Sequence, residues 1–156
     1  MAATYIIDLS KVDAAFDAIE HVELTSADWE QIGAFAVAQI LDRTERGLNP
    51  YGLPFARYAV ATARDRSQRG RLAGTVNLMD TGRMLGALTS GVVQNTARLT
   101  FANAEREKIA AFHQEGTRTM PARQFLSIHE RTSYYNKLSD LAAKLLVKNL
   151  EKSLRT

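Results

Sequence analysis

The chain has 156 residues, no cysteine, 46% hydrophobic and 24% charged residues, and a formal net charge of +3. This is the composition of a single globular domain, which excludes a collagen-like, low-complexity or wholly disordered chain. Disulfides, thiol nucleophiles and cysteine-bound metals are excluded as well. No apolar run approaches the roughly 18 residues that cross a bilayer, so we expect no membrane partner.

Charge is unevenly distributed along the sequence. Residues 1–30 hold seven acidic side chains and one lysine, so this segment is formally −6 and the rest of the chain is +9. We divide the single domain of residues 1–156 into an acidic N-terminal arm or helix, residues 1–24, and a body, residues 25–156. The acidic arm can pair with a basic surface of its own chain or of a neighbouring copy. The alternative is a solvated acidic helix face.

Two helices are predicted in the first third of the chain. Ser10-x-x-Asp13 has the capping-box pattern, and the apolar residues from Val12 to Val22 follow at helical spacing. A second helix is predicted from about Ala27 to Arg46, with its N-cap at Thr25, Ser26 or Asp28. The middle of this helix, residues 33–38, is rich in glycine and alanine, which allows another backbone to approach closely.

The next segment combines turn residues with arginines. Asn-Pro-Tyr-Gly-Leu-Pro at 49–54 predicts an ordered loop, because apolar side chains alternate with the helix breakers. A short helix is predicted for residues 56–64. Residues 64–71 contain four arginines, and we predict an exposed, mobile loop there.

The second half predicts a small sheet and two further helices. Residues 81–85 indicate a turn into a short helix, and residues 91–101 favour a β-hairpin around 94–96. A helix begins at Asn103 or Ala104 and ends at Gly116. Ser127-x-x-Glu130 is a capping-box pattern that opens the longest helix, to about Ser153. The predicted fold class is α+β, helix-rich with a small antiparallel sheet and a long C-terminal helix.

Catalytic motifs are not found in the sequence. His113-Gln114-Glu115 has the H-x-E spacing of zinc deaminases, but the cysteine ligands of those enzymes are missing. There is no P-loop, dinucleotide-binding fingerprint or nucleophile elbow. A histidine just before a helix-ending glycine is typical of a capping or packing residue. We therefore expect no catalytic residue, cofactor or metal, and a protein that is not an enzyme.

The arginines of residues 64–71 are the one electrostatic feature with a functional interpretation. Guanidinium groups hold phosphates well, which makes a small basic DNA-binding module one candidate function. The competing interpretation is a solvated loop, or a surface that pairs with the acidic arm of another subunit. Aromatic residues are not interleaved with these arginines, which argues against stacking on single strands.

Four motifs in a fixed order resemble a known family. They are Arg46-Gly47 followed by Asn49-Pro50-Tyr51-Gly52-Leu53-Pro54-Phe55, then Thr81-Gly82-Arg83-Met84-Leu85, Ile109-Ala110-Ala111-Phe112-His113-Gln114-Glu115-Gly116 and Met120-Pro121-Ala122-Arg123-Gln124-Phe125-Leu126. Their order and spacing, across roughly residues 43–130, are similar to those of the tail-completion or virion morphogenesis (neck) proteins of tailed bacteriophages. Ile109, where an aromatic residue is usual, and Gln124, where a second proline is common, depart from the pattern.

The resemblance implies a structural subunit of the virion neck, assembled in the host cytoplasm. Such subunits form a ring that completes the tail or joins tail to head around the DNA channel, and they catalyse no reaction. The implied partners are identical subunits, with a hexamer favoured over a dodecamer, the adjacent head–tail connector and tail tube proteins, and packaged DNA in the lumen. A ring requires two different complementary faces. The candidate subunit or DNA contacts are Asp13, Asp17, Glu20, Glu23, Arg64, Arg66, Arg69, Arg71 and Arg123.

Overall fold

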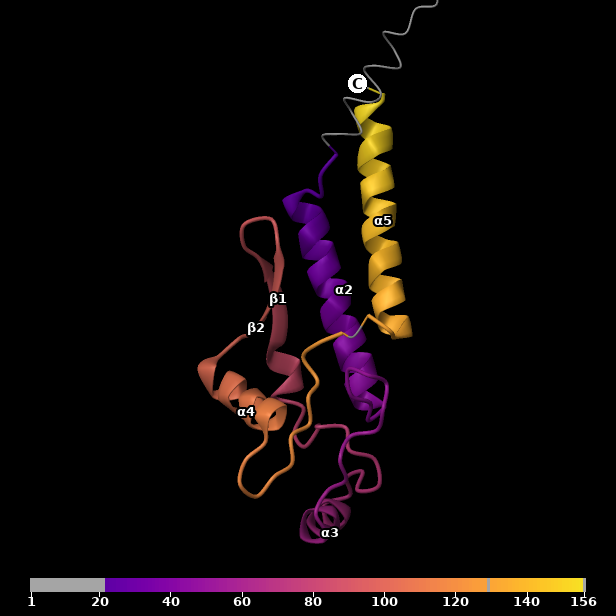
Figure 1. Cartoon of the computed structure of the whole chain (residues 1–156). Helices are drawn as coiled ribbons and strands as arrows, with labels where there is room; N and C mark the ends of the chain where they lie inside the picture. Colours follow the sequence, from indigo (N-terminus) through magenta and orange to yellow (C-terminus); the bar gives the residue numbers. More distant parts are fainter. Residues whose placement is uncertain (1–21, 129, 156) are drawn as a thin grey trace, which may run out of the picture.

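The structure is a computed structural model that describes residues 22–128 and 130–155. In this part of the chain four α-helices, a short 3-10 helix and a two-stranded antiparallel sheet form an elongated α+β fold (Figure 1). The predicted fold class is confirmed. In chain order the elements are α2 (Ser26–Glu45), α3 (Val60–Gln68), η1 (Leu85–Ala87), β1 (Leu88–Val92), β2 (Ala97–Phe101), α4 (Ala104–Glu115) and α5 (Ser133–Ser153).

Helix α2 is fixed at its start by a complete capping box. The Thr25 hydroxyl accepts a hydrogen bond from the backbone N–H of Asp28 (3.2 Å), and the Asp28 carboxylate accepts one from the backbone N–H of Thr25 (2.8 Å). Of the predicted N-cap candidates Thr25, Ser26 and Asp28, Thr25 is therefore the N-cap. At the other end Gly47 has φ +79°, the left-handed conformation that commonly follows a helix. The predicted extent of this helix is confirmed.

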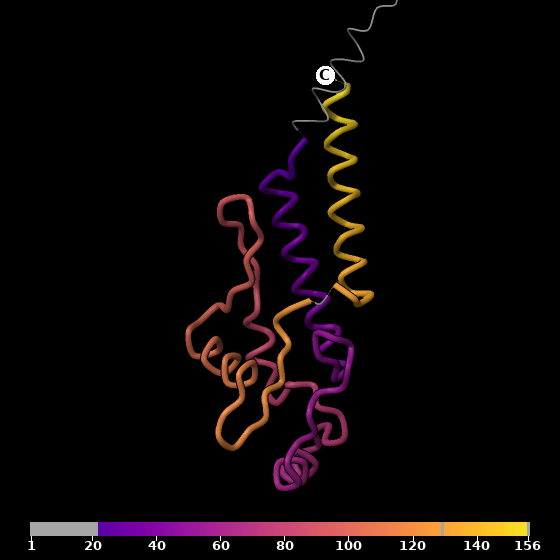
Figure 2. The backbone as a smooth tube through the Cα atoms, viewed as in Figure 1, coloured from indigo at the N-terminus to yellow at the C-terminus, as the bar shows by residue number. Residues whose placement is uncertain are grey.

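Helix α2 lies between the β-hairpin and α5, and α5 runs antiparallel to it (Figures 1 and 2). The hairpin pairs Leu88 with Phe101 and Val92 with Ala97. It confirms the predicted hairpin, although the first strand starts three residues earlier than expected. A Cβ atom at Gly33 of α2 would fall against Ser90 of β1, so the small residues in the middle of α2 do permit the close approach that they predicted.

The hairpin, α2 and α5 form one layer in Figure 1, and the main core lies below it. There the C-terminal half of α2 meets α4 and the long connecting segments. Side chains from five separate parts of the chain are buried together there: Ile40, Phe55, Val76, Leu78, Met84, Leu85, Leu88, Ala110 and Phe125. Helix α4 begins at its N-cap Asn103 and ends at Gly116, as predicted. None of the helices in the described ranges is long and apolar enough to span a membrane.

The predicted starts of two helices are wrong, and α3 also ends later than predicted, at Gln68 rather than at residue 64. Helix α3 begins at Val60 rather than near residue 56, because the carbonyls of Ala56 and Arg57 accept hydrogen bonds from the distant Arg123 side chain. Helix α5 begins at Ser133, not at the Ser127–Glu130 capping pattern. There Leu126 and Ile128 pack against the core, and the chain is not helical at either residue. The predicted end of this helix, Ser153, is confirmed.

Candidate functional site

The arginine-rich segment is a folded cluster rather than the exposed loop that the sequence predicted. Residues 64–68 belong to α3, and three of the four arginines donate to a single carboxylate, that of Asp80. The distances from Asp80 are 3.3 Å to Arg66 Nη1 and 3.4 Å to Arg69 Nη1, and Arg71 is the third donor. The Arg71 hydrogen bond, followed by the charges of Arg69 and Arg71, holds the pKa of Asp80 below its usual value.

Arg66 is a structural residue with only 4% of its surface exposed. Its Nε donates to the carbonyl of Leu72 (2.8 Å) and its Nη2 to the carbonyl of Met79 (3.0 Å). These bonds tie α3 to the segment that follows it, residues 72–80. The prediction of an exposed loop is therefore wrong for Arg66, because burying a guanidinium group requires the several partners that this fold provides.

Arg123 is equally buried, with 4% of its surface exposed. Its Nε donates to the carbonyl of Ala56 (2.8 Å) and its Nη2 to the carbonyl of Arg57 (2.9 Å). The Tyr58 ring lies between the two buried guanidinium groups, 4.6 Å from that of Arg66 and 5.3 Å from that of Arg123. Arg66 and Arg123 were predicted as subunit or DNA contacts, but both hold the body together from inside.

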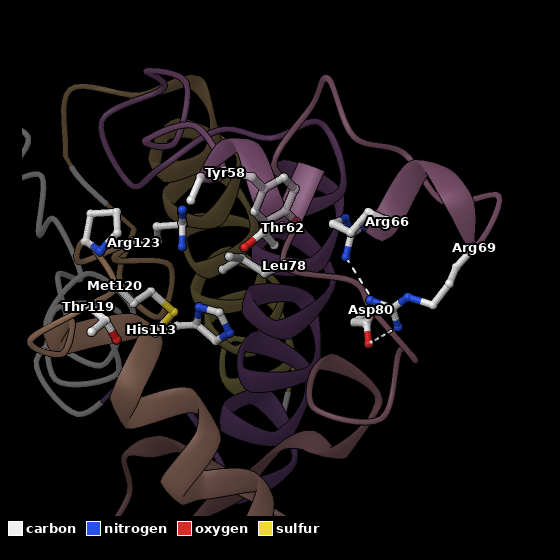
Figure 3. A pocket seen from close by; sticks show the side chains of 12 residues that line it. Tyr58, Thr62, Arg66, Arg69, Leu78, Asp80, His113, Thr119, Met120 and Arg123 are labelled. Atoms are coloured by element: carbon white, nitrogen blue, oxygen red, sulfur yellow. Dashed lines mark hydrogen bonds and ion pairs between the residues drawn. The ribbon is translucent and has the colours of Figure 1, made fainter. Parts of the chain in front are cut away.

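A cavity of about 420 Å³ lies beside the Tyr58 ring and the guanidinium groups of Arg66 and Arg123 (Figure 3). Helix α3 forms one wall, the end of α4 and the segment 119–123 form another, and Asp80 closes one end. The lining residues are Tyr58, Ala59, Thr62, Arg66, Arg69, Leu78, Asp80, His113, Thr119, Met120, Pro121 and Arg123. A volume of this size is typical of small-molecule sites.

Polar atoms near one end of the cavity lack partners. Arg123 Nη1 has no hydrogen-bond partner in the described part of the chain, although the other two guanidinium nitrogens are bonded. His113 Nδ1 and the Tyr58 hydroxyl are buried without a partner among the described residues. Burial, helped by the positive charge of Arg123, lowers the pKa of His113. The imidazole is therefore neutral at pH 7.

A second notable surface is the side of α5 that faces away from α2. Tyr134 and Leu145 of α5 are buried, but other large apolar residues of the helix are exposed. The exposed fractions are 43% for Tyr135, 37% for Leu146 and 54% for Val147, and Leu154 just after the helix is 52% exposed. The spacing of Tyr135, Leu146, Leu150 and Leu154 places them along one side of the helix. We call these four residues and Val147 the α5 stripe.

Of the four acidic residues predicted as contacts, the structure describes one, and it lies near this stripe. Asp13, Asp17 and Glu20, with the helix predicted for residues 12–22, lie outside the described residues. Glu23 is described, and its carbonyl accepts a hydrogen bond from Asn149 Nδ2 (3.1 Å). The same amide nitrogen donates to Asp28 (2.8 Å). The chain therefore leaves the body beside the C-terminal half of α5.

Arg64 is the remaining predicted contact. Its side chain is exposed on α3, and it forms no ion pair within the described ranges. Arg69 also pairs with Asp65, which is four residues earlier on the same helix. Two carboxylates thus offset much of the positive charge that the sequence assigned to residues 64–71.

Sequence reasoning missed the cavity. Its polar residues come from four segments of the chain: residues 58–69, Asp80, His113 and residues 119–123. An indirect signal did exist, because Tyr58, His113 and Arg123 are the kinds of residue that gather in binding pockets. No local sequence pattern, however, predicts that these three residues lie close together in the fold.

Comparisons of the chain with protein-family models, with curated proteins and with solved structures gave no match. The resemblance to phage neck proteins therefore rests on the four motifs alone.

Proposed function

We propose that this chain is a structural subunit that assembles with identical copies into a ring in a bacteriophage neck. The ring completes the tail or joins tail to head around the DNA channel. The α5 stripe is the observation that carries the proposal. Four of its five large apolar side chains are exposed to water and Leu150 is half-buried, and exposed apolar surface of this kind is typical of an interaction surface.

The acidic arm has the chemistry to cover the stripe. Its sequence carries apolar residues at helical spacing, among them Phe16 and Ile19, together with Asp13, Asp17 and Glu20. Helix α5 carries four lysines against two acidic residues. Apolar contacts and opposite charges would therefore favour the same pairing.

A contact between different surfaces of two copies is what a ring requires. The arm leaves the body beside Asn149, within two turns of Leu146 and Leu154. We infer that the arm of one copy lies on the α5 stripe of the next. The resemblance of residues 43–130 to phage neck proteins supports the proposal that the ring belongs to a phage neck. The α5 stripe and the acidic arm support the proposed contact between copies.

The size of the assembly tests this proposal. Mass photometry and negative-stain electron microscopy of the full chain should show a closed ring. Replacing Val147→Lys, or deleting residues 1–21, should shift the population to monomers. The control Lys144→Arg changes a side chain of the same helix but keeps its charge, and it should leave the ring unchanged. A wild-type chain that stays monomeric at every concentration and salt condition would overturn the proposal.

The alternative function, a small basic DNA-binding module, receives less support from the described residues. Asp65 and Asp80 already pair with three of the arginines, and only Arg64 remains unpaired on α3. The alternative predicts duplex affinity that falls steeply with salt. Arg64→Ala should then weaken DNA binding and leave the ring intact. If DNA binding is unchanged, this function is excluded for α3.

A further inference from the structure

We propose that the cavity beside Tyr58 binds a small oxyanion with the charge and shape of phosphate. This site is independent of ring formation, because its lining residues lie on α3, on the end of α4 and on segment 119–123, away from the α5 stripe (Figures 1 and 3).

The lining of the cavity is positively charged. Arg66, Arg69 and Arg123 carry positive charges, Asp80 carries the one negative charge, and His113 is neutral at pH 7. The formal net charge of the lining is therefore +2. A concave surface with this excess and with apolar walls concentrates anions.

The positive charge is not equally available along the cavity. Near Asp80, the Arg66 and Arg69 guanidinium groups already donate to that carboxylate. At the other end, Arg123 pairs with no carboxylate among the described residues, and its guanidinium group donates there to two backbone carbonyls. A buried guanidinium group without a counter-charge is costly, and an anion beside it would remove that cost.

The donors at this end suit a tetrahedral oxyanion. Within the described part of the chain Arg123 Nη1 donates no hydrogen bond, and Thr62 and Thr119, whose hydroxyls can donate, also line the cavity. Figure 3 shows Arg123, His113, Met120 and Thr119 around the same end of the cavity, with Thr62 on the wall formed by α3. Charge-assisted hydrogen bonds from an arginine are about twice as strong as neutral ones. Phosphate is smaller than the cavity, so there is space for a group esterified to it.

Two sources can supply this chemistry, a free phosphate or small phosphate ester, and a phosphate of a nucleic-acid strand. The probe for the first is inorganic phosphate, added to the full chain at constant pH and ionic strength. We expect saturable changes in the backbone amide signals of residues 58–69 and 113–123 in NMR spectra. Thermal unfolding should move to higher temperature with phosphate but not with chloride.

Variants on α3 test the place of binding without removing a buried side chain. Thr62→Trp puts a large ring at the cavity wall and should abolish phosphate binding. Its matched control, Ala61→Trp, puts the same ring at an exposed neighbouring position that does not line the cavity, and should bind phosphate normally. Arg69 lies at the Asp80 end of the cavity and is already paired with carboxylates, so Arg69→Ala should weaken phosphate binding by no more than about threefold, and Arg64→Ala should leave it within about twofold.

A short DNA duplex distinguishes the two sources. Competition between duplex and phosphate, lost in Thr62→Trp but kept in Ala61→Trp, assigns the site to a nucleic-acid phosphate. Phosphate binding without such competition assigns it to a free phosphate or small ester, and either result supports the site. The proposal is overturned if phosphate produces no saturable change beyond that of chloride, or if Thr62→Trp and Ala61→Trp bind it equally.

Discussion

Ser90 occupies the space into which a side chain at Gly33 would extend. A Cβ atom at Gly33 would lie 2.8 Å from both Cβ and Oγ of Ser90, which is closer than such atoms pack. The contact joins α2 to β1 and sets how closely the hairpin lies on the helix. We expect Gly33→Ala to lower the free energy of unfolding by about 1–3 kcal/mol through overpacking. A mid-helix glycine-to-alanine change without a clash would instead raise it by up to about 1 kcal/mol. Urea denaturation measures the difference.

Ser90→Gly provides the matched control for this contact. In the Gly33→Ala background it removes the two nearest atoms that the new methyl group meets and leaves Ala97 Cβ at 3.3 Å, so it should recover part of the lost stability. A double-mutant cycle then gives a coupling of about 0.5–3 kcal/mol. Purely additive effects of the two substitutions would show that the close approach does not constrain the helix.

Asp80 is the shared acceptor for Arg66, Arg69 and Arg71, and it should contribute to stability accordingly. Asp80→Asn removes the only carboxylate that pairs with the buried Arg66 in the described chain. We expect a loss of about 1 kcal/mol in the free energy of unfolding, because Arg66 is buried but the Asp80 side chain is 48% exposed and water screens its ion pairs. Chemical denaturation at pH 7 and moderate salt would measure it.

The control for Asp80 is Asp65, which also pairs with Arg69 but lies on the exposed side of α3. Exposed ion pairs four residues apart on a helix contribute about 0.3–0.5 kcal/mol, so Asp65→Asn should cost no more than that. Equal losses from the two substitutions would mean that the burial of Arg66 does not depend on its carboxylate partner.

Elements that are defined by local signals were predicted well from the sequence. The capping residues Thr25 and Asn103 and the terminating glycines Gly47 and Gly116 act on the nearest turns, so the extents of α2 and α4 follow from a few neighbouring residues. The hairpin is likewise set by a short turn between β-prone segments.

Features that depend on distant partners were not predicted. Arg66 has the sequence context of an exposed charge, but its burial depends on Tyr58 and on acceptors in residues 72–80. Arg123 delays the start of α3 by bonding to carbonyls more than 60 residues earlier in the chain. The cavity depends on both buried arginines, so the sequence identifies residues that line it but not that the fold brings them together.

His113 should make stability depend on pH in a defined window. Its pKa in the folded chain is lowered by burial and by Arg123, so the unfolded chain binds a proton more readily. The free energy of unfolding should therefore be constant above the unfolded pKa of about 6.5 and fall as the pH drops below it. Asp28 and Asp80, whose pKa values are also lowered, add their own loss only below about pH 4.

The histidine contribution is separated from the others by His113→Gln, which does not titrate. In this variant the free energy of unfolding should change less between pH 6.5 and 5 than in the wild type, while the loss below about pH 4 remains. Denaturation midpoints measured at half-unit steps of pH would show this. An unchanged slope between pH 6.5 and 5 would contradict the assignment to His113.

Gly116 and Gly52 allow a comparison between two glycines with similar φ angles and different surroundings. Gly116 has φ +80° and Gly52 has φ +77°, a conformation that is unfavourable for other residues. A Cβ atom at Gly116 would lie 2.8 Å from the backbone nitrogen of Ala122, whereas one at Gly52 would meet nothing within 4 Å.

Replacement by alanine should therefore affect the two sites differently. Gly52→Ala should lower the free energy of unfolding by about 1–2 kcal/mol, the cost of the left-handed conformation alone. Gly116→Ala should cost more for two reasons. The backbone of Gly116 has φ +80° and ψ 177°, which essentially only glycine adopts, and the methyl group must also displace the backbone of the segment that carries Pro121 and Arg123 to the cavity. It should weaken phosphate binding as well, since that segment forms one wall. Equal losses of stability, with phosphate binding unchanged in both variants, would show that the contact between Gly116 and Ala122 does not position the cavity wall.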